Sequence, residues 1–413
     1  MIRRPPRSTQ SRSSAASDVY KRQAGNLSNR LGGEIWTGGL AVDAGGRLLN
    51  RGELHAGNQV DNAGELINRP GGSLFYDGML NTGSLSNEGQ LSGWGWGDFV
   101  NQGQVVNAGE FQAGAFSNAA GGRLVNTGSF SHSLQFDNAA GGRVENRGQM
   151  TADGEIVNRG EFIVSGHLQN NASTWGPAYY TGSILNNEGG VFTVEAGGTV
   201  SGPGTYFQSH HDSVTRVNGT LAASDITLRE GVLTGSGTLV GPVTLGWGSG
   251  ATVQPGHSPG TLTVDGNLDA YYAHFDIELA GPGSYDRLVV TGDARFTGGV
   301  VNFLLRTPDG INFDYRPAAG DGFTWLTVGG TVQGLDGLDW TLTVVGDGWT
   351  STLASSYWGS TEWIWGPTQM DGVRIAFHGD SIVFAPVPEP ETWAMLLAGL
   401  GLVGWAARRR RSV

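Results

Sequence analysis

The chain has 413 residues, of which 70 are glycine and none is cysteine, and its formal net charge is −12. The absence of cysteine excludes a disulfide framework and thiolate-bound metal. Residues 1–23 carry six basic side chains against one acidic, and four arginines follow at 408–411, so residues 24–407 are more acidic than the net charge suggests. A body of that charge repels phosphate backbones, and we expect no nucleic-acid partner.

Residues 1–23 form a basic leader that differs from the rest of the chain. They lack the apolar stretch of about 7–15 residues that a secretory signal needs, and Lys21 is the only lysine in the chain. The segment resembles translated adapter sequence, which implies that the native export signal is missing; a genuine disordered basic arm is the alternative. We therefore leave the leader out of the fold prediction.

Residues 24–270 form a repeat array in which Asn-x-Gly units recur in two interleaved series. The first series consists of Asn62, Asn81, Asn101, Asn118, Asn138 and Asn158, with steps of 19, 20, 17, 20 and 20 residues. The second consists of Asn68, Asn87, Asn107, Asn126 and Asn146, with steps of 19, 20, 19 and 20. Short alternating apolar runs lie between the asparagines, which predicts short strands separated by turns.

This period predicts an all-β fold, a right-handed parallel β-helix (a β-solenoid) of about 12 coils of ~20 residues each. Since Asn and Gly tolerate positive φ best, we expect the Asn-x-Gly units to turn the chain at corners. Asparagines stacked at equivalent corners would form hydrogen-bonded ladders. A disordered glycine-rich chain is the alternative, which the in-phase apolar residues disfavour.

The array is similar to the passenger repeats of filamentous haemagglutinins and autotransporters. Near its end, Pro-Gly-x-Ser-Pro-Gly at 255–260 resembles the final coils of autotransporter-type β-helices. The spaced residues Asp286, Leu288, Val290 and Gly292 are similar to a segment that follows this element in many such surface proteins. The resemblance implies a fold and carries no chemistry.

Residues 271–385 lose the Asn-Gly period and alternate apolar and polar residues between glycine-rich turns. We expect a β-rich region that caps the β-helix, because an uncapped coil exposes unpaired strand edges. Trp363 and Trp365 lie two residues apart and would share one face of a strand. The favoured interpretation is that such rings fill a small core, and glycan contact is the alternative.

Few residues suggest catalysis or a metal. His210, His211 and Asp212 are adjacent, but a metal site needs three or four converging ligands, and a polar loop between coils is favoured. Asp276 and Glu278 would share a strand face, as the acidic pair of a glycosidase can, yet two solvated carboxylates on a strand are common. We expect no enzymatic activity, no cofactor and no metal; a carbohydrate-active β-helix enzyme and a carbohydrate-binding protein are the alternatives.

Residues 386–413 combine a Pro-Glu-Pro segment, an uncharged apolar stretch at 392–407 and a block of arginines. As a helix the stretch reaches about 24 Å, short of the ~30 Å hydrocarbon core, so its length alone is ambiguous. Tryptophans at both ends and arginines after the second favour one short transmembrane helix with a cytoplasmic C-terminus. These anchor and orientation residues are Trp393, Trp405, Arg408, Arg409, Arg410 and Arg411.

The order of these elements resembles the PEP-CTERM sorting signal. The resemblance implies export through the inner membrane of a Gram-negative bacterium and transient residence in that membrane. It also implies removal of the tail by an exosortase-type enzyme that recognises Pro388, Glu389 and Pro390. The mature protein would be a structural or adhesion protein of the cell surface or extracellular matrix, associated with exopolysaccharide or biofilm.

Overall fold

The computed structural model describes residues 20–23, 25–171, 183–247, 250–256, 259–306, 315, 317–346, 349–356, 373–386 and 400. The chain divides into two compact units, Met1–Leu245 (unit 1) and Gly246–Val413 (unit 2). The described elements are β-strands, apart from a single 3-10 turn, η1 (Leu335–Gly337), and a helical assignment at residue 400. The predicted all-β fold is therefore confirmed.

The predicted transmembrane segment at 392–407 lies outside the described residues except for Leu400. Within the part of the chain that the structure describes, no helix has the length and apolar character needed to cross a membrane.

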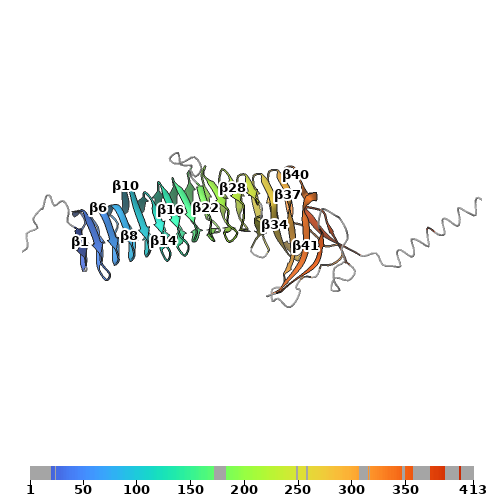
Figure 1. Ribbon diagram of the computed structural model, residues 1–413, viewed down its shortest axis with the longest axis horizontal. Helices are drawn as coiled ribbons and strands as arrows, with labels where there is room; N and C mark the ends of the chain where they lie inside the picture. The colour runs from blue at the N-terminus through green and yellow to red at the C-terminus, as the bar shows by residue number, and fades with distance from the viewer. Residues whose placement is uncertain are drawn as a thin grey trace, which may run out of the picture. The chain divides into compact units, whose positions relative to one another are not determined.

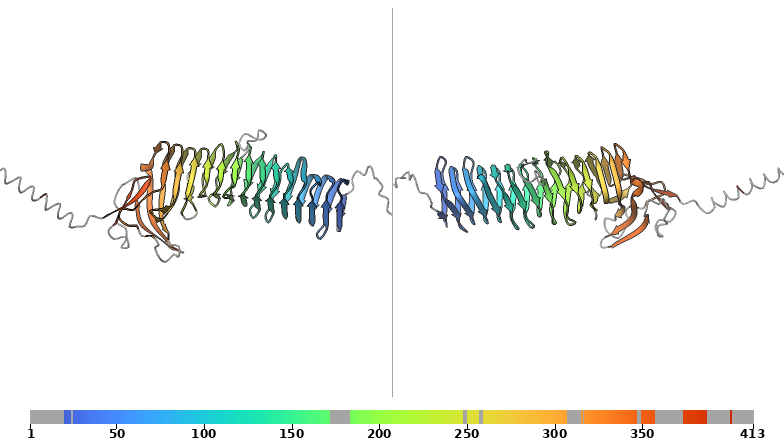
Figure 2. Two further views of the ribbon diagram at one scale, coloured as in Figure 1. Left: turned by 180° about the vertical axis from the view of Figure 1, so that it is seen from behind. Right: turned by 45° about the horizontal axis from the view of Figure 1, so that its top comes forward.

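Unit 1 is a parallel β-solenoid with three strands in each coil. Each strand pairs in parallel with the strand of the same face in the next coil, as β11 (Gln104–Asn107) does with β14 (Arg123–Asn126). Figure 1 shows these strands stacked from β1 to β28, and Figure 2 shows the same stacking from two other sides. The predicted parallel β-helix with coils near 20 residues is confirmed.

The strands of unit 1 form three faces, A, B and C. Face A contains β2 (Asn26–Asn29), β5 (Arg47–Asn50), β7 (Glu65–Asn68), β9 (Ser84–Asn87), β11, β14, β17 (Arg143–Asn146), β20 (Glu161–Val164), β23 (Val191–Val194), β26 (Val214–Val217) and β29 (Val232–Gly235). Face B contains β3 (Glu34–Thr37), β12 (Glu110–Ala113), β15 (Ser129–His132), β18 (Gln149–Ala152), β21 (His167–Asn170), β24 (Thr199–Ser201), β27 (Thr220–Ala222) and β30 (Thr238–Val240).

Face C contains β1 (Tyr20–Gln23), β4 (Gly39–Val42), β13 (Phe116–Asn118), β16 (Gln135–Asn138), β19 (Glu155–Asn158), β22 (Ser183–Asn186), β25 (Thr205–Gln208), β28 (Ile226–Leu228) and β31 (Val243–Leu245). Three longer strands run from face B into face C: β6 (Glu53–Asn62), β8 (Ser73–Asn81) and β10 (Gln90–Asn101). The last four residues of the basic leader form β1, which pairs with β4.

The second residue of a typical strand points inward and is apolar. On face C, Phe99, Phe116 and Phe136 are paired with one another in successive coils, two residues before the ladder asparagine, and each is at most 1% exposed. Their rings stack with centroids 5.1 and 4.9 Å apart. Burial of one such side chain contributes about 1.5–3 kcal/mol, so a column of them stabilises the stack along its whole length.

The fourth strand position also points inward, and here the asparagines lie. Each side-chain amide donates to the Oδ1 of the next asparagine, over N–O distances of 2.7–3.0 Å including the final bond to Gln208. The ladder on face A contains Asn29, Asn50, Asn68, Asn87, Asn107, Asn126 and Asn146. The ladder on face C contains Asn62, Asn81, Asn101, Asn118, Asn138, Asn158, Asn186 and Gln208. The predicted ladders are confirmed.

Each amide also uses its second hydrogen. Asn107 donates to Asn126 Oδ1 (2.7 Å) and to the carbonyl oxygen of Ser129 (2.8 Å), which begins the next strand of the following coil. Asn126 repeats the pattern with Asn146 and Gln149. A buried amide whose N–H groups and oxygen all have partners escapes the desolvation penalty, so the ladder joins each coil to the next.

The predicted reason for the Asn-x-Gly units is wrong, because the ladder asparagines are extended strand residues. Among described non-glycine residues only Glu188 (φ 49°) and Tyr272 (φ 52°) have positive φ. The glycine is required by close approach: a Cβ at Gly103 would lie 2.1 Å from the carbonyl oxygen of Gly83 in the preceding coil. Left-handed conformations occur mainly at other glycines, among them those of the Gly-Gly corners, such as Gly121 (φ 80°).

Unit 2 begins with parallel strands and ends with antiparallel ones. Its strands are β32 (Thr252–Pro255), β33 (Thr261–Asp265), β34 (Leu268–Gly281), β35 (Ser284–Tyr285), β36 (Arg287–Val290), β37 (Ala294–Arg306), β38 (Gly322–Thr324), β39 (Leu326–Val328), β40 (Val332–Gln333), β41 (Asp339–Gly346), β42 (Trp349–Ser356), β43 (Val373–Phe377) and β44 (Ser381–Pro386). Strands β34, β37 and β41 pair in parallel, whereas β42 pairs with β41 antiparallel. Strands β38, β44 and β43 form a separate antiparallel sheet.

Tryptophan fills the core of unit 2. Trp325 is fully buried, packs on Phe275 with ring centroids 5.1 Å apart, and donates from Nε1 to the carbonyl oxygen of Gly379 (2.8 Å). Trp340 is 2% exposed. The interpretation of the tryptophans as core residues is right for these two.

One inward position of unit 1 carries a buried histidine. His132 is 1% exposed and lies beside Phe130 and Phe136, and neither of its ring nitrogens has a hydrogen-bond partner. Burial lowers the pKa of His132 to about 3. The imidazole is therefore neutral in the folded protein at every pH above that value.

Replacement of Asn107 by Asp tests the ladder. The aspartate loses both N–H donors and places a carboxylate against the Oδ1 of Asn126, so we expect Asn107→Asp to lower the free energy of unfolding by about 3 kcal/mol. Asn26→Asp is the matched control, since Asn26 is exposed on a strand of the same face. Urea titration followed by circular dichroism measures both variants; equal effects would contradict the ladder's role.

His132 predicts a pH dependence of stability. Between about pH 6.5 and pH 3 the unfolded chain binds a proton at this residue that the folded chain does not, so stability falls as pH falls, by up to about 1.4 kcal/mol per pH unit. His132→Leu should remove this component, whereas His211→Leu, at a side chain 71% exposed, should retain it. Urea titrations at pH 7.5, 5.5 and 4.5 measure the free energy of unfolding of wild type and of both variants. The same dependence of this free energy on pH in all three proteins would contradict the prediction.

Candidate functional site

The predicted sorting, anchor and glycan-contact residues lie outside the described residues. They are Trp363, Trp365, Pro388, Glu389, Pro390, Trp393, Trp405, Arg408, Arg409, Arg410 and Arg411. The candidate surfaces described below therefore come from other parts of the chain.

The cluster at 210–212 lies in the turn between β25 and β26. One potential ligand atom from each of His210, His211 and Asp212 lies within 4.8 Å of the others. His210 Nδ1 accepts the Asp212 backbone N–H at 3.4 Å, and His211 Nε2 lies 3.2 Å from Asp212 Oδ2. All three side chains belong to one largely exposed turn and already contact one another. The geometry agrees with a polar loop between coils.

Asp276 belongs to a polar ladder on the outside of unit 2. Its Oδ2 accepts from Gln254 Nε2 (3.0 Å) and its Oδ1 from Asn302 Nδ2 (2.8 Å), while Thr341 donates to Asn302 Oδ1 (2.6 Å). A general base needs an oxygen positioned to accept the substrate proton. Because both oxygens of Asp276 accept from neighbouring strands, the residue serves to join strands.

Asp286 explains the spaced motif after the Pro-Gly-x-Ser-Pro-Gly element. Its carboxylate is 2% exposed and accepts the backbone N–H groups of Gly260 (2.8 Å) and Glu278 (2.9 Å). It therefore fixes the end of the Pro-Gly loop against β34. Asp286 therefore has a structural role. The resemblance of this motif to other surface proteins likewise implied a fold and no chemistry.

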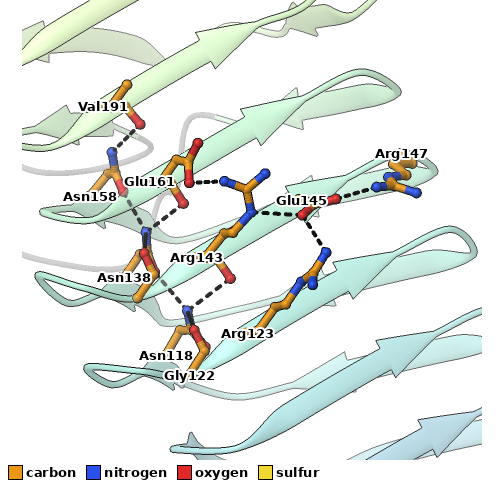
Figure 3. A network of polar contacts seen from close by, with 11 residues as sticks. Asn118, Gly122, Arg123, Asn138, Arg143, Glu145, Arg147, Asn158, Glu161 and Val191 are labelled. Atoms are coloured by element: carbon orange, nitrogen blue, oxygen red, sulfur yellow. Dashed lines mark hydrogen bonds and ion pairs between the residues drawn. The ribbon is translucent and has the colours of Figure 1, made fainter.

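A network of charged side chains covers part of face A in unit 1 (Figure 3). The side chain of Glu145 is 5% exposed and pairs with Arg123 and Arg143, each at 2.8 Å, and with Arg147. Arg143 also pairs with Glu161 of the next coil. Burial raises the pKa of Glu145, but hydrogen bonds from Arg143 and Arg147 and the charge of Arg123 outweigh this effect and lower that pKa to about 2.

The same residues connect this network to the asparagine ladder. The backbone carbonyls of Arg143 and Glu161 accept from Asn118 (3.3 Å) and Asn138 (3.1 Å), as Figure 3 shows. The interior ladder and the exterior ion pairs therefore fix the same strand starts. The pair of Glu145 with Arg123 joins β14 to β17, and the pair of Arg143 with Glu161 joins β17 to β20, so the network holds these coils in register.

Face B carries a column of stacked rings that the sequence analysis missed. Trp36 and His55 stack with centroids 3.8 Å apart, and His55 and Phe75 with centroids 4.7 Å apart. These residues occupy the same outward position in successive strands. The sequence contains a signal for this column, because the three residues lie one coil apart. The signal is short, since aromatic residues occupy this position in only a few coils. Because the rings stack face to face, the column joins the first coils.

The comparisons with known proteins agree with these observations. Residues 386–411 match the PEP-CTERM protein-sorting motif, which marks proteins exported across the inner membrane of Gram-negative bacteria to the cell surface or extracellular space. No match was found among the curated proteins. Residues 32–267, more than half of the chain, match the BigA fourth domain. The resemblances to a sorting signal and to an autotransporter-like body are confirmed, and the chain is an exported protein that belongs to the BigA fourth-domain family.

Proposed function

We propose that this protein is a non-enzymatic structural or adhesion protein of the extracellular matrix, associated with exopolysaccharide. The observation that carries the proposal is the pair of continuous amide ladders inside unit 1. Adjacent coils are joined by main-chain hydrogen bonds on three faces and by buried side-chain amides on two of them, faces A and C. Such a stack resists bending and shear, which suits a stiff element outside the cell.

The surface charge supports the same role. The strongly acidic body keeps neighbouring molecules apart and soluble at high local concentration. Ion pairs between coils, such as Arg47–Glu65 and Arg69–Glu88, neutralise basic side chains of unit 1. An extended acidic scaffold is compatible with a hydrated polysaccharide matrix.

The C-terminal tail serves in this proposal as a temporary membrane anchor. The apolar stretch at 392–407 holds the chain in the inner membrane, and the four arginines keep its end in the cytoplasm. An exosortase-type enzyme recognises Pro388, Glu389 and Pro390 and removes the tail. The motif match over 386–411 supports this sequence of events.

Intact-mass analysis of the protein released by its bacterial host tests the tail. The mature chain should lack the arginines at 408–411, and Glu389→Ala should shift the protein to the membrane fraction with its tail retained. Glu391→Ala, at the neighbouring position outside the Pro-Glu-Pro segment, is the control and should be processed normally. A released chain that still carries the four arginines would contradict the proposal that the tail is removed.

The non-enzymatic role has its own test. Incubation of the released protein with the host exopolysaccharide should yield no new reducing ends and no unsaturated products, because both oxygens of Asp276 are held by neighbouring amides. Cleavage that disappears in Asp276→Ala or His211→Ala would instead establish a carbohydrate-active enzyme.

A further inference from the structure

We infer that a surface of unit 2 binds the backbone of a neutral pyranose polysaccharide. This surface, the aromatic patch, consists of Trp247, Asp269, Tyr271, Tyr272 and Arg295. The inference rests on the proposed function, since it names the site at which a matrix polysaccharide would be held.

The rings of the aromatic patch are unusually exposed. Trp247 is 66% and Tyr272 57% exposed, whereas Trp325 and Trp340 of the same unit are at most 2% exposed. The exposed parts of these rings can contact a ligand from solvent. The patch therefore differs from the core tryptophans in its position and in what it can contact.

The backbone is arranged to present two consecutive tyrosines. Along β34 buried and outward residues alternate, but Tyr271 and Tyr272 both face outward between the buried Ala270 and Ala273. This break in alternation requires the left-handed conformation of Tyr272 (φ 52°), which is strained for a residue with a side chain.

The facing strand accommodates the second tyrosine. Strands β34 and β37 lie side by side in Figure 1, and Tyr271 pairs with Thr297 and Ala273 with Gly299. Gly298 therefore lies opposite Tyr272, and a Cβ at Gly298 would approach the tyrosine ring to 2.9 Å. The absence of a side chain at Gly298 gives the ring its place.

Polar groups hold the first tyrosine and line its edge. The guanidinium of Arg295 lies 5.5 Å from the centroid of the Tyr271 ring and donates to its hydroxyl oxygen. Arg295 Nε donates to Asp269 Oδ1 at 3.0 Å. The indole of Trp247 lies 6.1 Å from Tyr271, with its plane inclined by 54°. The rings of Trp247 and Tyr271 thus lie at an angle to each other before any ligand binds. Arg295 supplies a hydrogen-bond donor at their rim, and Asp269 supplies an acceptor.

This arrangement matches the two-sided chemistry of a pyranose. The C–H groups on one side of the sugar ring pack on an aromatic face, whose electron density is negative. The hydroxyl groups at its rim both donate and accept, so they can pair with a carboxylate and a guanidinium together. The ligand is neutral because Arg295 is already paired with Asp269 and the acidic body repels polyanions.

Titration of the released protein with soluble dextran, soluble mixed-linkage β-glucan and the host exopolysaccharide tests the inference. Trp247→Ala and Tyr271→Ala should each weaken binding to the polysaccharide that binds wild type by about tenfold or more, equivalent to ~1.4 kcal/mol. Trp36→Ala is the matched control, because Trp36 is 62% exposed on unit 1 and outside the patch. Unchanged circular dichroism and unfolding midpoints show that the variants are folded.

Three outcomes would overturn the inference. Binding could be unchanged in both patch variants, or lost equally in Trp36→Ala, or absent in wild type for all three polysaccharides. A protein ligand captured by wild type and lost in Trp247→Ala would also replace it with a different partner. None of these results affects the tail, whereas retention of the tail in the released protein would refute the proposed function without changing polysaccharide binding.

Discussion

The hydrogen bond from one buried asparagine amide to the next is the interaction on which unit 1 depends. A polar side chain in an apolar interior costs about 1–3 kcal/mol if a donor or acceptor has no partner. Asparagine avoids this cost because one N–H reaches the next amide oxygen and the other reaches a main-chain carbonyl. Aspartate lacks the donors, and leucine would leave the carbonyl without this bond. The ladder therefore favours a side-chain amide at this position and joins each coil to the next.

The ladders also explain how the solenoid tolerates uneven coils. Asn158 and Asn186 are 28 residues apart, yet their amides are joined at 2.8 Å, as in coils of ordinary length. The asparagine of β19 is therefore in register with the asparagine of β22, as in the coils of ordinary length. On face A the ladder ends where Val164 takes the position after Asn146. On face C it ends at Gln208, whose Oε1 accepts from Thr215 and whose Nε2 donates to the Glu230 carbonyl. Beyond these points the ladder position itself is apolar, as at Val217 on face A and Leu228 on face C.

Much of unit 1 was predictable, because contacts between successive coils appear in the sequence as a period. The two asparagine series predicted the coil length and the ladders. They could not show that the asparagines point inward as strand residues, since Asn and Gly at a corner also fit a left-handed turn. The polar ladder through Asp276 was not predictable for another reason: its members Gln254, Asn302 and Thr341 lie 22 to 39 residues from their partners and differ in type. Only the register of β32, β34, β37 and β41 brings them together.

The interior of the solenoid repeats from coil to coil, so residues that differ between coils lie on its outside and at its corners. Outward positions can vary without disturbing the ladders, because the amides bond only to one another and to the main chain. A corner that needs positive φ is most easily formed by glycine, and Gly298, opposite Tyr272, follows that rule. Position 272 has positive φ but carries tyrosine and not glycine. Glycine there would remove the strain and preserve the pairing of β34 with β37. A residue that is strained where glycine would fit is best explained by a use for its ring, and at this corner the ring faces solvent beside Tyr271.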